Sequence, residues 1–131
     1  MKLQWLKDYK ELEKDIASLE LNLERSEREL RRWVQGDLAK YKLTEESIAS
    51  NLEEKIEVIR YELACKMNDQ RKILDMISKF DTLENKIIVG KYIEGKTLEE
   101  IAEQHQYSTQ YIYNKHAQLK KTIRFVELMA I

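Results

Sequence analysis

Apolar residues in the first quarter of the chain follow alternating steps of four and three. The positions are Trp5, Tyr9, Leu12, Ile16, Leu19, Leu23, Leu30 and Trp33, with the polar Ser26 filling the one remaining step. This spacing is typical of a coiled-coil seam, because it keeps returning to one face of a helix. It predicts a helix from about Lys2 to Gln35, ~50 Å long at ~1.5 Å per residue. We expect both tryptophans to lie in the core.

A second long helix is predicted after a connector around residues 36–43. Thr44 can cap it, because a threonine oxygen can accept a hydrogen bond from the first turn. The apolar stripe of this helix comprises Ile48, Leu52, Ile56, Ile59, Leu63 and Met67, resuming at Ile73, Leu74 and Ile77. The looser spacing leaves open whether Asn68-Asp69 bends the helix or starts a new one. Cys65 lies near the stripe, and we expect its thiol to be packed.

The charges beside the first seam bear on how the two helices pair. The flanking positions are mainly acidic: Asp8, Glu13, Asp15, Glu20, Glu27 and Glu29. Two parallel copies of this helix would set carboxylate against carboxylate, which disfavours that pairing. The second helix offers Lys55, Arg60 and Lys66 instead. We therefore expect the two helices to fold back as an antiparallel coiled-coil hairpin within one chain.

The pattern shortens from Asp81 onward. Asp81 with Glu84, and Thr97 with Glu100, form two capping-box pairs that each open a helix, and Gly95 can end the first of them. After a turn around residues 105–107, a serine is placed to cap a third helix. These signals predict three short helices, the last two of which are joined by a tight turn.

The last two helices fit the geometry of a helix-turn-helix. That geometry needs a small residue where the helices cross and an apolar anchor on the second helix. Ala102 and Ile112 meet these needs, and Leu119 and Ile123 continue the apolar face. The sequence thus predicts a helix-turn-helix domain between Asp81 and Phe125.

Composition supports an all-α fold. Proline is absent and glycine occurs three times in 131 residues, so little interrupts a helix once it has begun. This length suits one domain, or a long helical element joined to a small domain. We expect a helical hairpin over residues 1–79, serving self-association or partner binding, and a tri-helical helix-turn-helix domain over residues 80–131.

The formal net charge of −1 gives no overall field that would attract nucleic acid. Charge is nevertheless segregated locally. The segment 104–124 carries Lys115, Lys120, Lys121 and Arg124 and no acid, whereas the segment 94–103 just before it holds Glu94, Glu99, Glu100 and Glu103 against Lys96. We therefore expect phosphates to meet the third helix and not the second. The alternative is an ordinary solvated helix face.

The residues from Glu84 to Ala102, ENKIIVGKYIEGKTLEEIA, resemble the start of sigma-70 region 4. The continuation, Tyr107-Ser108 through IYNKH at residues 112–116, is similar to the late-gene and ArpU-type transcriptional regulators of Gram-positive phages. The resemblance covers roughly residues 73–125. Residues 1–70 match no promoter-melting region of a sigma factor, so a complete sigma factor is not expected.

The resemblance implies which residues contact DNA. Those implied to face the major groove are Thr109, Gln110, Tyr113, Asn114 and Lys115, and those implied to lie towards backbone phosphate are Lys120 and Lys121. The chain departs from the family at residues 118–120, where an Ala-Leu pair is more common. The resemblance therefore does not define where the recognition helix ends.

The chemistry of these side chains gives a second, independent reason for some of the assignments. Gln110 and Asn114 each pair a donor with an acceptor, which suits adenine, although amides are also common on any surface. We expect Tyr107 to be a core residue. His105 and His116 are far apart and have no cysteine companion, which favours packing, capping or phosphate contact over zinc.

Nothing in the sequence points to catalysis, a cofactor or a metal. No nucleophile with a base and no phosphate-cradling glycine loop is present. The single Cys65 excludes an internal disulfide. There is no secretory leader, and no apolar run approaches the ~18 residues of a membrane span. We therefore expect a cytoplasmic protein that is not an enzyme and has no membrane partner.

The leading interpretation is a sequence-specific DNA-binding transcriptional regulator whose partner is double-stranded DNA. The resemblance adds bacterial RNA polymerase as a partner, and the hairpin offers a route to a homodimer. The alternative is a coiled-coil interaction protein whose sigma-like domain binds RNA polymerase or another protein without reading DNA. A DNA-packaging subunit like a small terminase is a third class, but there we would expect the DNA domain first.

Overall fold

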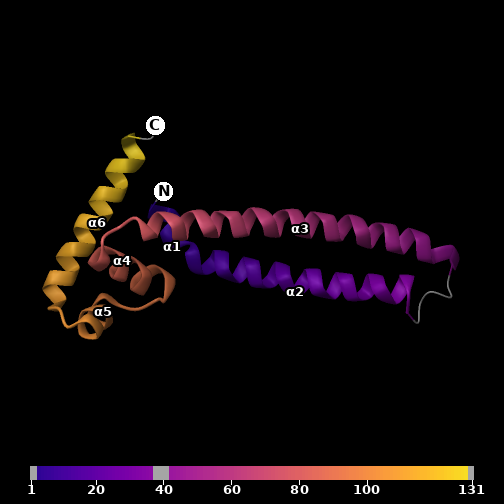
Figure 1. The fold of residues 1–131 in the computed structure, drawn as a ribbon, viewed down its shortest axis with the longest axis horizontal. Helices are drawn as coiled ribbons and strands as arrows, with labels where there is room; N and C mark the ends of the chain where they lie inside the picture. Colours follow the sequence, from indigo (N-terminus) through magenta and orange to yellow (C-terminus); the bar gives the residue numbers. More distant parts are fainter. Residues whose placement is uncertain (1–2, 37–41, 130–131) are drawn as a thin grey trace. The chain divides into compact units, whose positions relative to one another are not determined.

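The computed structural model describes residues 3–36 and 42–129, with the side chains of residues 42–47 excepted. Every regular element in these ranges is helical and none is a strand, which confirms the all-α expectation. In chain order (Figure 1) the elements are α1 (Leu3–Lys7), α2 (Tyr9–Val34), α3 (Lys42–Ser78), α4 (Thr82–Ile88), the π-helical turn η1 (Val89–Ile93), α5 (Leu98–His105) and α6 (Thr109–Met129). They pack as two units: Glu13–Asn68, and Met1–Leu12 together with Asp69–Ile131.

In the unit Glu13–Asn68, which we call the helix pair, α2 and α3 run side by side in opposite directions. Its buried residues are Ile16, Ser26, Leu52, Ile56 and Ile59, so the one polar position of the seam also faces inward. Arg60 donates to Glu27 across the two helices at 2.9 Å, and Lys66 donates to Asp15 at 3.0 Å. Later residues of α2 therefore meet earlier residues of α3, as an antiparallel arrangement requires.

The other unit, which we call the core unit, closes around one apolar cluster. Its buried members are Leu3, Leu6, Tyr9, Ile73, Ile77, Ile87, Ile88, Leu98, Ile101, Ala102, Ile112, Leu119 and Ile123. They come from both sides of the division expected at residues 79/80, because α1 and the end of α3 pack with α4, α5 and α6. The expectation that Trp5 is core was wrong. Trp5 is 46% exposed, whereas Leu6 is fully buried, since α1 is a separate helix whose inward face does not follow the α2 seam.

Helix α3 differs from its expected form in three ways. It begins at Lys42, so Thr44 lies inside the helix and does not cap it. It also continues without a break through residues 68–69 to Ser78. The expectation of a packed thiol at Cys65 was wrong, because the side chain is exposed. After Leu63 the inward stripe passes through Lys66, so the cysteine turns to solvent.

The capping residues of the core unit are those predicted. The side-chain oxygens of Asp81, Thr97 and Ser108 each accept a hydrogen bond from the backbone N–H three residues later. The distances are 2.9 Å for Asp81 and 3.1 Å for Thr97 and Ser108. Gly95 takes a left-handed conformation with φ of 73°, which glycine adopts without steric cost. Local hydrogen bonding thus fixes where the three C-terminal helices begin, as the sequence indicated.

The expected single helix over residues 82–93 is divided. At Val89 the α-helical pattern widens into the π-helical turn η1, and the Glu94 N–H donates to the Val89 carbonyl at 2.9 Å. Gly90 lies in this turn, where an added Cβ would come within 2.8 Å of Ile101 Cγ1. The glycine therefore allows η1 to approach α5 closely.

Candidate nucleic-acid interface

The turn between α5 and α6 orients the candidate interface. Helix α5 ends at His105, and the next residue, Gln106, caps it: Gln106 adopts a left-handed conformation and donates its N–H to the carbonyls of Ala102 and Glu103. The Tyr107 N–H also donates to the Ala102 carbonyl, at 2.9 Å. Ala102 and Ile112 are buried, as predicted for the helix crossing and its anchor. The start of α6 is thereby fixed against α5.

Helix α6 has one buried face and one open face. The buried face carries Ile112, His116, Leu119 and Ile123. The opposite face carries Gln110, Asn114, Ala117 and Lys121, all exposed and spaced by four, three and four residues, which we call the outward row. Within the row, Gln110 Nε2 donates to Asn114 Oδ1 at 3.1 Å, so the two amides form a pair. The outward row presents amides and a cation to solvent, and no acid.

Ala117 was missing from the residues singled out in the sequence. Its small side chain has no chemistry of its own, but helical spacing from Asn114 and Lys121 would have placed it in the row. Because a methyl group is short, the backbone of α6 at this point can approach a flat surface closely.

Tyr113 and Lys120 lie on one flank of the row. The Tyr113 hydroxyl donates to the Glu99 carboxylate on α5. This hydrogen bond is the main reason why the pKa of Glu99 is lowered and the pKa of Tyr113 is raised. Tyr113 thus ties α6 to α5, a role that the sequence did not reveal. Thr109, the first residue of α6, is exposed.

Lys115 lies on the opposite flank, beside two stacked tyrosines. Its Nζ is 5.8 Å from the centre of the Tyr111 ring, and the rings of Tyr107 and Tyr111 stack with centroids 5.4 Å apart. The expectation that Tyr107 is core was wrong, because it is 42% exposed. Tyr107 directly follows the left-handed Gln106, and its ring packs on Tyr111 in the first turn of α6.

His116 is a packing residue. It is 7% exposed, and its Nε2 lies 2.8 Å from the Tyr92 hydroxyl. Burial, with smaller effects from Lys120 and Lys91, lowers the pKa of His116 to about 4. Burial also raises the pKa of Tyr92, so at neutral pH the tyrosine keeps its proton and can donate to an uncharged imidazole. Of the roles left open by the sequence, the contacts favour packing.

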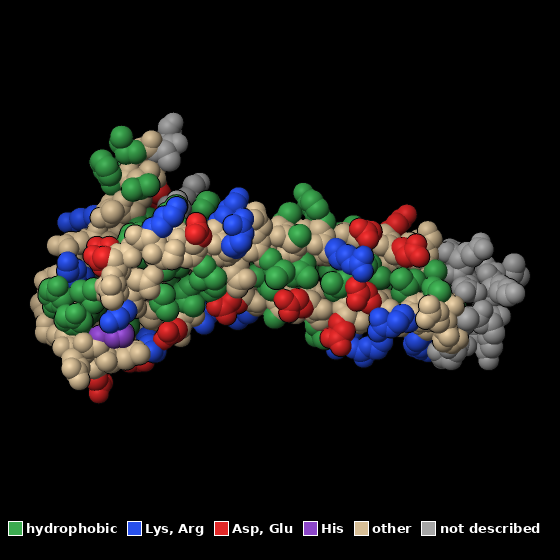
Figure 2. Space-filling view, viewed as in Figure 1, with side chains coloured by type: hydrophobic (Ala, Val, Ile, Leu, Met, Phe, Trp, Pro, Cys, Tyr) green, Lys and Arg blue, Asp and Glu red, His purple; other side chains and the backbone are tan. Residues whose placement is uncertain are grey.

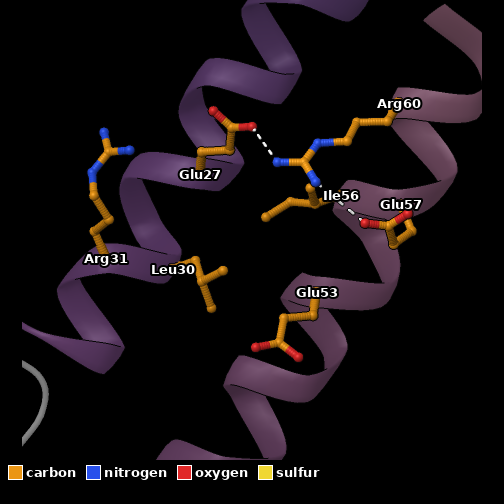
Figure 3. Close-up of a pocket in the computed structure, with 7 residues that line it drawn as sticks. All are labelled: Glu27, Leu30, Arg31, Glu53, Ile56, Glu57 and Arg60. Atoms are coloured by element: carbon orange, nitrogen blue, oxygen red, sulfur yellow. Dashed lines mark hydrogen bonds and ion pairs between the residues drawn. The ribbon is translucent and has the colours of Figure 1, made fainter. Parts of the chain in front are cut away.

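The helix pair carries a shallow groove of mixed charge (Figure 3). Leu30 and Ile56 supply its apolar surface, and Arg60 bridges Glu27 at 2.9 Å and Glu57 at 3.3 Å. Since these charges bind one another, the groove serves the pairing of α2 with α3, and we assign no ligand to it.

In residues 3–36 and 42–129, no group of three or more His, Cys, Asp or Glu side chains is placed to hold a metal ion. No helix in the same ranges has the length and apolar character needed to span a membrane.

No protein-family model, curated protein or solved structure matches this chain.

Proposed function

We propose that the protein is a sequence-specific DNA-binding transcriptional regulator in which α5, the turn at Gln106 and α6 form a helix-turn-helix. The outward row of α6 is the observation that carries this proposal. An acid-free row of amides and a cation, held on a helix whose other face is anchored in a core, suits the recognition helix of this motif, which lies in the major groove.

The amide pair suggests how a base is read. With Gln110 Nε2 bonded to Asn114 Oδ1, the groups left open include the Gln110 oxygen, an acceptor, and the Asn114 nitrogen, a donor. Adenine presents the matching pattern in the major groove, a donor at N6 and an acceptor at N7. We propose that the two side chains act together on one A·T pair.

The cations suggest how α6 is positioned in the groove. Lys115 lies on one flank of the outward row, Lys120 lies on the other, and Lys121 lies within the row. A major groove has a phosphate backbone along each edge, so cations on both flanks can contact both strands. Thr109 can add a neutral contact at the start of the helix. Tyr113 supports this surface through α5.

Two wider parts of the proposal rest on the resemblance and on the helix pair. Similarity of residues 84–102 to sigma-70 region 4 supports action beside bacterial RNA polymerase. The long helix pair supports a protein-binding role for residues 13–68. Both parts extend the DNA-binding proposal and can be tested after it.

Selection from a random double-stranded DNA library with the full chain tests the proposal, and an enriched motif containing a required A·T pair is expected. Lys121→Ala should weaken binding to all sequences and lower the log–log salt slope by about 0.9, the value for one lost phosphate contact. Lys55→Ala is the matched control, because it removes the same charge from the helix pair. Gln110→Ala or Asn114→Ala should leave the slope intact but relax one base preference by ~1–3 kcal/mol.

The opposite results would overturn the proposal. If no motif is enriched, or if Lys121→Ala and Lys55→Ala have the same salt dependence as the original chain, α6 is not a DNA-reading helix. Binding of the full chain to RNA polymerase without DNA would then favour the interaction-protein alternative.

A further inference from the structure

The outer surface of α6 changes its chemistry near its C-terminal end. Its last core residue is Ile123, which is 4% exposed. The following turns expose four large apolar side chains: Phe125 at 63%, Val126 at 51%, Leu128 at 69% and Met129 at 72%. Hydrophobic side chains accordingly gather on the surface at this end of α6 (Figure 2). We call these four residues the apolar end.

The apolar end does not suit contact with DNA. At ~1.5 Å per residue, its midpoint lies ~20 Å along the helix from Asn114, and recognition helices contact bases through their N-terminal residues. One side of this segment is already covered, because the Leu3 N–H donates to the Glu127 carboxylate. The remaining apolar surface is chemically suited to contact with another protein surface.

We infer that a second copy of this chain covers the apolar end, with the two α6 helices antiparallel and Phe125 of one copy beside Met129 of the other. In a two-fold interface, if Phe125 of the first copy contacts Met129 of the second, then Met129 of the first copy must also contact Phe125 of the second. An antiparallel pairing centred on position 127 meets this condition. The inference rests on the proposed DNA-binding function for its biological role.

Charge favours this occupant. The last turn of α6 that the structure describes has no basic residue of its own, and the C-terminal end of a helix carries partial negative charge. Arg124 directly precedes the apolar end, and Lys121 lies about one turn before it. In the antiparallel pair, Arg124 lies level with the C-terminal end of the other copy's α6 and complements its charge, while Lys121 remains available to DNA.

The spacing of the two recognition surfaces agrees with this arrangement. Thirteen residues separate Asn114 from the centre of the pairing, so the two Asn114 residues lie ~40 Å apart if the helices are collinear, and less if they cross. Half-sites on successive turns of one DNA face are ~34–36 Å apart. The inference therefore predicts an inverted repeat with half-sites about one helical turn apart.

The pairing is expected to be weak without DNA. Four side chains per copy fall short of the ~800 Å² that each partner buries in a standard stable interface. DNA with two half-sites holds the copies together, so the contact should appear mainly as cooperative binding.

Site-directed crosslinking tests the geometry. Two variants are made, both with Cys65→Ser. The first variant also carries Phe125→Cys, and the second also carries Met129→Cys. A mixture of the two variants should form disulfides faster than either variant alone. In the proposed pairing, position 125 of one copy lies ~6 Å along the helix axis from position 125 of the other, and the same holds for position 129. A disulfide needs Cβ atoms ~4 Å apart, which only the 125–129 pair provides. The original chain, with its exposed Cys65, measures collisional crosslinking.

DNA binding tests the role. The double variant Phe125→Ser, Met129→Ser should keep its affinity for one half-site but lose roughly tenfold or more on the inverted repeat, an ordinary size for coupling between sites. Val58→Ser, Tyr61→Ser is the matched control, since it removes two exposed apolar side chains from the helix pair. Circular dichroism checks that both variants remain folded.

The outcomes separate the two proposals. Equal crosslinking in the mixture and in each copy alone, or full cooperativity in the α6 variant, overturns the pairing while leaving half-site binding intact. Loss of cooperativity only in the Val58, Tyr61 variant assigns self-association to the helix pair and also overturns it. Failure of the original chain to bind any DNA overturns the proposed function, and position-specific crosslinking would still support the pairing.

Discussion

The helix pair and the core unit solve the same packing problem by different means. In the helix pair, two long helices share one seam, and large side chains such as Val58 and Tyr61 remain 59% and 72% exposed. In the core unit, several helices approach from different directions and close around fully buried residues such as Leu6, Ile87, Ile101 and Ile112. The helix pair has little interior, whereas the core unit encloses its apolar side chains.

This difference bears on where a precise recognition surface can be built. A side chain is held in a fixed position when the element that carries it is packed from several sides. Helix α6 meets this condition, because its buried face contacts α1, α4 and α5. A helix with a single seam can bend or shift along its partner, so the helix pair suits a role that depends on reach or broad contact.

The largest expected effect comes from deleting one core side chain in each unit. Ile101→Ala should cost ~4–5 kcal/mol and Ile56→Ala ~2–3 kcal/mol, the upper and lower parts of the range for this change. Ile101 is fully buried, so its loss leaves an enclosed cavity, whereas Ile56, although only 3% exposed, borders a groove from which water can enter the space that the substitution opens. Urea unfolding followed by far-UV circular dichroism measures both.

Ile101→Val and Ile56→Val are the matched controls, because they remove a single methyl group at each position. Equal losses for the two alanine variants would contradict the contrast between an enclosed core and an open seam.

The sequence predicted local features of the fold well. The caps at Asp81, Thr97 and Ser108 involve partners three residues away, so their signals lie within one turn. Trp5 and Tyr107 were misplaced because their burial depends on tertiary neighbours. The seam pattern could not show that α1 turns its other face to the core, nor that the left-handed Gln106 directs Tyr107 outwards.

The same distinction applies to the candidate site. Helical period alone places Gln110, Asn114 and Lys121 on one face, and Ala117 could have been added in the same way. The Tyr113 hydrogen bond to Glu99 joins residues on two helices, and no spacing rule predicts it. The Tyr92–His116 contact likewise depends on how η1 packs against α6, so the histidine's role stayed open.

A loss of stability smaller than that of Ile101→Ala should follow from titration of His116 in the core unit. Its pKa falls from 6.5 to about 4 on folding, so between these values the unfolded chain binds the additional proton. Stability should therefore be unaffected above pH ~6.5, fall as the pH drops towards ~4, and lose about 3 kcal/mol in total. Urea unfolding at a series of pH values measures this loss.

His116→Gln is the control, since glutamine can accept the Tyr92 hydrogen bond but does not titrate. Subtracting its pH profile removes the contributions of the other titrating groups, which the two chains share. A variant with the same pH dependence as the original chain would show that His116 is not the group responsible.

The smallest effect is expected from the ion pairs of the helix pair, where charge selects the register more than it adds stability. Arg60 and Glu27 are 53% and 34% exposed, and exposed pairs contribute little because water and salt screen them. Arg60→Glu should still lower the thermal midpoint slightly at low salt, because it sets a new carboxylate beside Glu27 and Glu57. Adding Glu27→Arg should restore part of the loss, and high salt should remove the difference between all three chains. If the thermal midpoint of Arg60→Glu stays low in high salt, the Arg60 side chain stabilises the helix pair through packing along the groove. The ion pair with Glu27 would then not be the cause of the effect.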